Sequence, residues 1–597
     1  MERLKIAIID SGIEDVKNYE GVAVYYDNIK QEYGICDNFY DKNGHGTIVT
    51  NIIKSQISDV DFFILKIFDE EDEVETDKLI FALKFLHDNI HPDIVHLSMG
   101  VTFCENISAL EQICSDMVNA NTVIVAAFDN NGAVSFPAAF TSVVGVESTK
   151  QIYKSKDYYY ISNSPINILA IGTAQRLLGK DNKYYDVVGT SFSAPYITSA
   201  IAKIMASKQC KMSKQEVLKY LKSQSKKTID SENVRCVEGP FEIKKGIIFP
   251  YNKEINTLLR HSESHIFHIN GIYDVKFLKN LGKIIIVRNK KIKIESFEKI
   301  DWEADFDTFI LGHIKEMESI SGRNYTEHII DKCIQYKKNL YSFDELTNAQ
   351  LETLKKANIK VFTPRRVKKN TPICYNGRLR QIGKPIVCIA GTSNKQGKFS
   401  LQLQLKSLLE KQIKIGFLST EPSGYLVGAD AVFPMGYNST INFDDGNNYI
   451  STVNCVLGQI EDKSIDLIIT GLQSQTIPTQ VCNLRDMVLY NHYFLLGVNP
   501  DAVILVVNVF DEIETIERTI SYLESIIVCD VISIVVFPVM RNFKWNTLGD
   551  LSYRYSDDEI NHFKNKLTKH FNKKVFVLDD NKDIKNLSKI CLKYFLR

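Results

Sequence analysis

Three short segments within the first 200 residues constrain this chain most strongly. They read IAIIDSGI, NGHGT and GTSFSAP, and they contain Asp10, His45 and Ser191. Aspartate, histidine and serine are the side chains of a nucleophilic catalytic triad, in which the histidine takes the serine's proton and the aspartate orients the histidine. The chain order Asp, His, Ser separates this arrangement from two other common orders of the same triad.

The local sequence around each of the three residues suits its expected role. Asp10 ends an apolar run, and Ser11-Gly12 is expected to turn the chain directly after it. His45 lies between two glycines, so its imidazole has small neighbours. Ser191 precedes the helix-like run SAPYITSAIAKIM. We therefore expect its backbone N–H and the helix dipole to point at a developing oxyanion.

Two further segments extend the pattern to five. The apolar run TVIVAAF leads towards Asn130, and DIVHLSMG contains Ser98, Met99 and Gly100. In these five segments, residues 1–230 resemble the subtilisin-family serine proteases. The resemblance implies that the side-chain amide of Asn130 donates to the oxyanion. It also implies that residues 98–100 pair with the substrate backbone as an added strand.

Two positions beside Asn130 depart from the family pattern. Phe128 and Asp129 replace the small residues that are usual just before the oxyanion asparagine.

Two other functions remain open for the whole chain. One alternative is a pseudo-protease that binds peptides as a scaffold while the C-terminal half carries ATP-dependent or transferase chemistry. Another is a transferase or kinase-like enzyme whose N-terminal domain only recruits the substrate.

Length and composition limit the number of domains, the charged partners and the location that we expect. A chain of 597 residues exceeds one hydrophobic core and predicts three or four domains. Lys+Arg and Asp+Glu are both 72, so no global charge favours nucleic acid or a membrane surface as a partner. The start MERLKIAIID predicts neither a signal peptide nor a propeptide, and the 12 scattered cysteines read as free thiols. These observations favour a cytoplasmic protein.

The order of apolar runs predicts an α/β protein built from successive domains. Residues 1–228 alternate buried runs with helical patterns, as expected for a subtilisin-like parallel-sheet domain. A polar linker is expected over 229–243, and a Rossmann-like domain over 244–380. A third α/β domain is expected over 384–597.

The third region begins with a signature for phosphate binding. The sequence GTSNKQGKFS lies between a predicted strand and a predicted helix, which is the context of a P-loop. The expected nucleotide-binding residues are Gly391, Thr392, Gly397, Lys398 and Ser400. ATP or GTP with Mg²⁺ is the expected cofactor at this loop, whereas proteolysis by the triad needs none. Which residues would hold a metal ion is left unknown.

Residues 245–597 resemble the D-glutamate N-acyltransferase-like and dethiobiotin synthetase-like P-loop proteins. The resemblance rests on the loop and on FPYNKEINTLLRH, FDTFILGH, KKNLYSFDEL and STEPSGYLVGAD. Phe399 stands where a Mg²⁺-binding Ser or Thr is usual, and Thr470 stands where the family has Glu. Asp466 is a candidate to order Mg²⁺ through water. A degenerate loop that only packs remains the alternative.

Together these features predict a cytoplasmic serine endopeptidase of the subtilisin family with a nucleotide-binding-like C-terminal module. The expected partner is a peptide or protein substrate. An intracellular protease without a propeptide must choose its substrates narrowly, and one such use is leader removal from a ribosomal precursor peptide.

Overall fold

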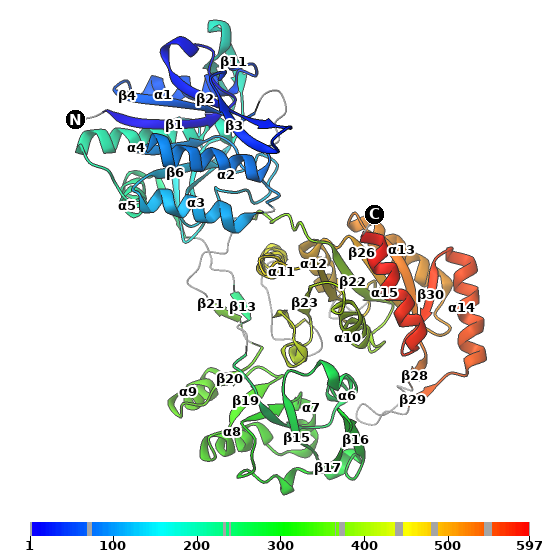
Figure 1. Ribbon diagram of the computed structural model, residues 1–597. Coiled ribbons are helices and arrows are strands. Elements are labelled where there is room, and N and C mark those ends of the chain that lie inside the picture. Colours follow the sequence, from blue (N-terminus) through cyan, green and yellow to red (C-terminus); the bar gives the residue numbers. More distant parts are fainter. Residues whose placement is uncertain are drawn as a thin grey trace. The chain divides into compact units, whose positions relative to one another are not determined.

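The computed structural model describes residues 3–68, 74–104, 106–230, 235–237, 240–364, 366–368, 377–435, 446–478, 488–541 and 552–595. The chain forms two compact units (Figure 1). Unit 1 contains 1–234 and 369–383, and unit 2 contains 235–368 and 384–597.

Unit 1 is built on a ten-stranded sheet in the order β12-β8-β9-β7-β6-β5-β1-β4-β2-β3. The strands are β1 (Leu4–Asp10), β2 (Glu20–Asp27), β3 (Glu32–Cys36), β4 (Val60–Lys66), β5 (Ile94–Leu97), β6 (Val123–Ala127), β7 (Val144–Thr149), β8 (Tyr159–Ser162), β9 (Ile166–Ile171) and β12 (Lys227–Asp230). A separate hairpin joins β10 (Gln175–Leu178) to β11 (Tyr184–Val187). The β2–β3 and β8–β9 pairs are antiparallel and the other pairs are parallel.

Helices cover both faces of this sheet, and the pattern of β1 shows why. Ile6 and Ile8 pack in one core with α1 (His45–Gln56), α4 (Ala194–Lys208) and α5 (Lys214–Gln224). Ala7 and Ile9 pack in the other core with α2 (Thr76–Phe85) and α3 (Ile107–Asn119). Side chains alternate between the faces of a strand, so Asp10 shares the α1 face with Ile6 and Ile8.

The course of the chain between the units differs from the expected boundaries. Lys227–Asp230 form β12, which pairs with β8, so the sheet of unit 1 extends to within the expected linker. Residues 369–383 belong to unit 1 by their contacts, although 369–380 were expected in the second domain. Packing against unit 1, described below, accounts for this difference.

The first half of unit 2 has a seven-stranded sheet in the order β16-β17-β15-β14-β18-β19-β20. Only the β16–β17 pair is antiparallel among the described pairs of this sheet. Its strands are β14 (Lys245–Phe249), β15 (His268–Asp274), β16 (Ile284–Val287), β17 (Lys290–Ser296), β18 (Thr308–Leu311), β19 (Asn339–Ser342) and β20 (Val361–Phe362). Its helices are α6 (Lys253–Arg260), α7 (Lys315–Ser321), α8 (Tyr325–Gln335) and α9 (Asn348–Lys356).

The second half of unit 2 has a parallel seven-stranded sheet in the order β24-β23-β25-β22-β26-β27-β30. Its strands are β22 (Ile386–Gly391), β23 (Ile415–Ser419), β24 (Ala431–Val432), β25 (Leu467–Gly471), β26 (Ala502–Asn508), β27 (Asp530–Phe537) and β30 (Lys574–Val577). Its helices are α10 (Lys398–Leu409), α11 (Gly446–Glu461), α12 (Val488–Val498), α13 (Ile513–Ile526), α14 (Asp557–Phe571) and α15 (Asn581–Phe595). Two short ladders pair β13 (Arg235–Val237) with β21 (Arg366–Lys368), and β28 (Val539–Arg541) with β29 (Ser552–Arg554).

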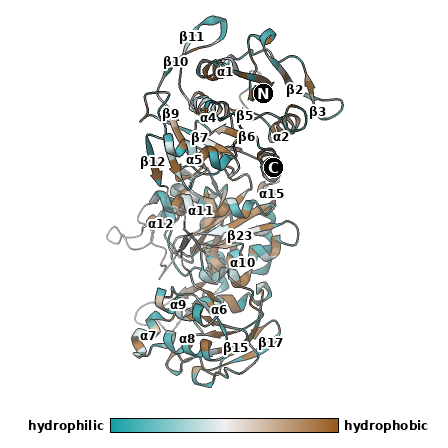
Figure 2. Ribbon diagram, turned by 90° about the vertical axis from the view of Figure 1, so that its left-hand side faces the viewer, coloured by the Kyte–Doolittle hydropathy of each residue, from teal (hydrophilic) through white to brown (hydrophobic). Residues whose placement is uncertain are grey.

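One hydrophobic core joins the two sheets of unit 2, since Ile248 and Leu258 share it with Val387 and Leu426. In Figure 2 hydrophobic residues gather along the strands, whereas hydrophilic residues gather on loops and outer helix faces. Over the described ranges, no helix combines the length and apolar character needed to cross a membrane.

Candidate active site

The sheet of unit 1 places Asp10 at the carboxyl end of a central strand, where it contacts His45. The distance from Asp10 Oδ1 to His45 Nδ1 is 2.8 Å, and the backbone N–H of Ser11 donates to the same oxygen at 2.8 Å. Burial by itself raises the pKa of the Asp10 carboxyl. The adjacent His45 and these hydrogen bonds outweigh burial, so the pKa lies below its ordinary value. Asp10 is therefore an anion that can orient the imidazole and stabilise its cation.

Two glycines allow His45 to begin helix α1 against the end of β1. Gly44 caps the helix with φ of 96°, a left-handed conformation that glycine adopts without strain. A Cβ on Gly46 would lie 2.3 Å from the carbonyl oxygen of Gly12. Only glycine permits this approach, so the two glycines around His45 are required by geometry.

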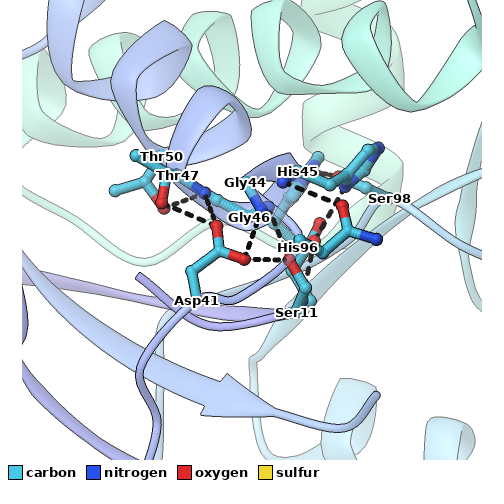
Figure 3. Close-up of polar contacts among 11 residues, drawn as sticks. Ser11, Asp41, Gly44, His45, Gly46, Thr47, Thr50, His96 and Ser98 are labelled. Atoms are coloured by element: carbon cyan, nitrogen blue, oxygen red, sulfur yellow. Dashed lines mark hydrogen bonds and ion pairs between the residues drawn. The ribbon is translucent and has the colours of Figure 1, made fainter. Parts of the chain in front are cut away.

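A second buried carboxylate holds the same loop, and the sequence pattern did not single it out. Asp41 Oδ1 accepts from Ser11 Oγ (2.9 Å) and from the Gly44 N–H (2.7 Å), as Figure 3 shows. Its Oδ2 accepts from the N–H (2.8 Å) and hydroxyl (2.6 Å) of Thr47. Asp41 therefore ties the first turn of α1 to the residue after Asp10, and its position four residues before His45 is the available signal.

A buried histidine completes the polar interior behind the site. His96 Nε2 contacts Ser98 Oγ at 2.7 Å (Figure 3). Its Nδ1 contacts Thr198 Oγ1, also at 2.7 Å. Burial lowers the pKa of His96 to about 4, so this ring is neutral at ordinary pH. One hydroxyl then donates to the ring and the other accepts from it. His96 thus joins the segment of Ser98 to helix α4, and a histidine within an apolar strand was the sequence signal.

The expected nucleophile lies at the entry to α4. Gly189 has φ of 139°, and Thr190–Phe192 form a single turn before the helix. Ser191 in this turn is largely buried, with 8% of its surface exposed. The ring of the next residue, Phe192, packs on His45 with centroids 4.9 Å apart. The turn that carries Ser191 therefore lies beside the His45 ring.

Asn130, the expected oxyanion donor, and its neighbour Asp129 have different hydrogen-bond partners. Asn130 Oδ1 accepts the N–H of Thr190 at 2.8 Å, so the amide is anchored next to Ser191 with its NH₂ group still available to donate. The Asp129 carboxylate instead accepts the N–H of Asn131 at 2.7 Å. Of the two side chains, Asn130 is thus the one held beside the turn of Ser191.

The expected substrate edge, Ser98, Met99 and Gly100, directly follows β5. The adjacent Val101 exchanges both backbone hydrogen bonds with Phe136, each 2.8 Å long. With Ser98 held by His96, both ends of this short segment are anchored. Its pairing with a substrate remains a prediction.

In unit 2, the loop that begins at Gly391 joins β22 to α10. Gly397 caps the helix with φ of 76°. The Nζ of Lys398 donates to the carbonyls of Ser393 and Ser474 at 2.7 Å each, and burial lowers its pKa to about 7. Thr392 and Ser400, the other expected ligands, are buried in the same segment.

One expectation about this half is corrected by the register of the sheet. Asp466 precedes β25 and accepts the N–H of Lys414 at 2.8 Å, whereas the Gly391 loop leaves the opposite, carboxyl edge of the parallel sheet. Asp466 is therefore not placed to order an ion at that loop. Thr470 is wholly buried and its hydroxyl donates to the carbonyl of Leu418, so it serves packing.

A further charged cluster lies at strand ends in unit 2. His313 contacts Asp344 through Nδ1 at 2.7 Å and Glu254 through Nε2 at 3.2 Å. Burial lowers the pKa of His313, but the two carboxylates outweigh it and raise the pKa to about 10. Glu254 also accepts the N–H of Ser423, so this cluster links the two halves of unit 2. The ends of the apolar runs FDTFIL and NLYS were the sequence signal for His313 and Asp344.

Comparison with known proteins identifies the class of unit 1. Residues 2–239 match the sequence profile of the subtilase family. The major intracellular serine protease of Bacillus subtilis is 25% identical over 246 residues, which are 37% of this chain and 75% of that protein. The N-terminal part of the chain is thus a subtilisin-like serine protease domain.

Two solved structures are similar to this part of the chain. A cold adapted subtilisin-like serine proteinase is 20% identical, with a TM-score of 0.30 over 37% of this chain and 81% of that one. The nisin leader peptidase NisP of Lactococcus lactis is 15% identical, with a TM-score of 0.30 over 37% of this chain and 82% of its own.

Replacement of the amide donor should reduce catalysis more than replacement of its neighbour. We expect Asn130→Ala to lower kcat about 10²–10³-fold with little change in KM, because the amide bonds mainly to the transition state. Asp129→Ala is the matched control and should have a much smaller effect. Steady-state kinetics with a fluorogenic peptide measure both, and the reverse ranking would move the donor by one residue.

Removal of the buried Asp41 carboxylate should loosen the loop that carries His45. Asp41→Ala leaves four donors without their acceptor, and each buried donor costs about 1–3 kcal/mol. We expect a lower melting temperature of unit 1 and a lower kcat, measured by calorimetry and peptide cleavage. The control is Asp37→Ala, an exposed carboxylate nearby, and equal effects of both variants would contradict this role.

Proposed function

We propose that Asp10, His45, Ser191 and Asn130 form the catalytic machinery of a serine endopeptidase. The proposal rests on two hydrogen-bonded pairs that lie next to each other, Asp10 with His45 and Asn130 with Thr190. Asp10 holds His45 at 2.8 Å, and Asn130 holds the residue before Ser191 at 2.8 Å. The contact between Phe192 and the His45 ring brings these pairs together.

Each side chain then has one step in peptide-bond hydrolysis. Ser191 Oγ attacks the scissile carbonyl while His45 takes its proton, and His45 later gives that proton to the leaving amine. The Asp10 carboxylate holds the imidazole and stabilises its cation. The Asn130 amide and the Ser191 N–H bind the oxyanion in the acylation step. Water then releases the acyl group by the same path.

The proposed substrate is an extended peptide segment. Ser98–Gly100 would pair with the backbone of this peptide, because the segment is anchored at both ends and directly follows the carboxyl end of β5. We also propose a cytoplasmic location, supported by the intracellular relative in Bacillus subtilis. An active protease there must spare other proteins. The finer proposal is therefore a narrow specificity, such as leader removal from a precursor peptide.

A second proposal concerns the Gly391 loop of unit 2, where we infer a phosphate site for ATP or GTP. The loop follows the carboxyl end of a central parallel strand and precedes a helix N-terminus, and Lys398 Nζ lies across it on two carbonyls. The loop N–H groups and Lys398 would hold the β and γ phosphates.

Substitution of the nucleophile tests the protease. Ser191→Ala should abolish both peptide cleavage and covalent labelling by a fluorophosphonate, because no other residue supplies the attacking oxygen. The fold should persist, since loss of one hydroxyl has a small effect on stability. Thermal unfolding of both proteins is the control. Labelling of Ser191→Ala equal to that of wild type would contradict the assignment, and peptide binding without cleavage by wild type would indicate the scaffold alternative.

Titration calorimetry of the full chain with ATP, GTP and Mg²⁺ tests the loop. We expect Lys398→Ala to weaken binding at least about tenfold, because it removes hydrogen bonds from a charged donor to phosphate. Lys411→Ala, an exposed lysine just after α10, is the matched control. Absence of binding by wild type at millimolar nucleotide would favour the degenerate loop.

A further inference from the structure

A short segment from the chain between the two halves of unit 2 is built into the protease unit. We call Gly377–Gly383 the strap, and its contacts assign it to unit 1. Leu379 forms a parallel bridge with Ala133, and its carbonyl accepts the N–H of Val134 at 2.9 Å. At the other end, a Cβ on Gly383 would lie 2.1 Å from the Phe103 ring, so the strap packs closely there.

Arg378 is the most strongly engaged residue of the strap. Its side chain is only 8% exposed and forms an ion pair with Glu147 of β7, whose side chain is 15% exposed. Its Nη1 donates to the carbonyl of Ala133 at 2.6 Å. Its guanidinium carbon also lies 5.2 Å from the centroid of the Phe128 ring. One planar cation therefore contacts the core sheet and the residues on both sides of a loop.

That loop is Asp129–Gly132, which carries the proposed oxyanion donor. Asn130 and Gly132 are exposed, and Gly132 has φ of 95° with nothing within 4 Å of the place that a Cβ would take. Within the loop, Asn130 Oδ1 accepts the N–H of Thr190 at 2.8 Å and the Asp129 N–H donates to Ser135 Oγ at 2.9 Å. The residues at its two ends, Phe128 and Ala133, both contact Arg378.

The position of this loop matters because oxyanion donors act only at the correct distance. A displacement of about 1 Å can cost about 100-fold in rate. The Glu147 carboxylate is largely shielded from solvent, with 15% of its side chain exposed, and would lose its cation if Arg378 left. The strap therefore helps to hold the loop Asp129–Gly132, which follows β6, in one position.

We propose that Arg378 is a positioning residue for proteolysis, which acts through Phe128 and Ala133 to fix Asn130. This inference rests on the proposed function of Asn130. It makes the protease dependent on a segment that comes about 190 residues after Ser191 in the sequence. The strap is followed directly by β22, so the same stretch of chain leads from the oxyanion loop to the Gly391 loop of unit 2.

The test is a double-mutant cycle in the full chain. The readouts are kcat and KM for a fluorogenic peptide and the inactivation rate with a fluorophosphonate, all measured below the melting temperature. We expect Arg378→Ala to lower kcat and the inactivation rate about 10- to 100-fold with KM nearly unchanged. In the Asn130→Ala background the same substitution should have little further effect, because the donor that it positions is gone.

Three further variants separate positioning from stability. Arg378→Lys keeps the charge but not the planar fork, so kcat should recover partly. Lys226→Ala removes an exposed ion pair with Asp157 in the same unit and should leave kcat unchanged. If Arg378→Ala fails to fold, Arg378→Lys and Glu147→Gln replace it in the double-mutant cycle with Asn130→Ala. Each of them should lower kcat only when Asn130 is present.

The outcomes are distinguishable. A lower melting temperature with unchanged kcat, or effects that multiply in the double variant, would overturn the positioning role and leave the protease intact. A wild-type chain that reacts with no fluorophosphonate would overturn the proposed function and the positioning role together.

Discussion

A carboxylate that has no exposure to solvent must be compensated by hydrogen bonds and a partner charge, and Asp10 imposes this requirement on unit 1. Its strand is in the centre of the sheet, with a parallel neighbour on each side. The alternation of side chains turns it to the face that α1 covers. His45 meets it there only because Gly46 lets the helix approach the chain at Gly12. Among the described residues, both hydrogen bonds to Asp10 reach Oδ1, and its buried Oδ2 has no hydrogen-bond partner, so the charge depends on His45 beside it.

The loops around this pair are held from outside the triad. Asp41 anchors the start of α1 through four accepted hydrogen bonds, and His96 anchors Ser98 through one buried ring. The Arg378 guanidinium performs the corresponding task for the loop of Asn130. In each case a buried polar group with fixed partners holds a segment beside the proposed catalytic residues. Such groups confer position more than stability.

In unit 2, too, polar groups with fixed partners hold parts of the chain together. Its two sheets share a hydrophobic core, and the cluster of Glu254, His313 and Asp344 lies where three parallel strands end. Glu254 reaches Ser423 in the other half, so charge as well as apolar packing joins the halves. Carboxyl ends of parallel strands are where open α/β sheets bind ligands. The Gly391 loop occupies the equivalent edge of the second sheet.

The sequence by itself was sufficient to predict strands of the first sheet and the local positions of the residues expected at the site. Apolar runs such as KIAIID and TVIVAAF form β1 and β6, and the motifs around Asp10, His45 and Ser191 placed each residue at a strand end or a helix start. These features were predictable because strand alternation, glycine turns and helix starts depend on residues that are neighbours in the chain. Asn130 was also within reach, since its strand aligns without gaps.

Only the tertiary structure decided the partners. Asp41, His96 and Arg378 each contact a residue far away in the sequence: Ser11 at 30 positions, Thr198 at 102 and Ala133 at 245. No sequence periodicity records such distances. The same limit explains the corrections. Asp466 precedes a strand as an acidic residue of the right type, but the parallel register puts it at the edge opposite the Gly391 loop. Residues 377–380 of the strap were expected in the second domain, but the strap belongs to the first unit, where Arg378 pairs with Glu147.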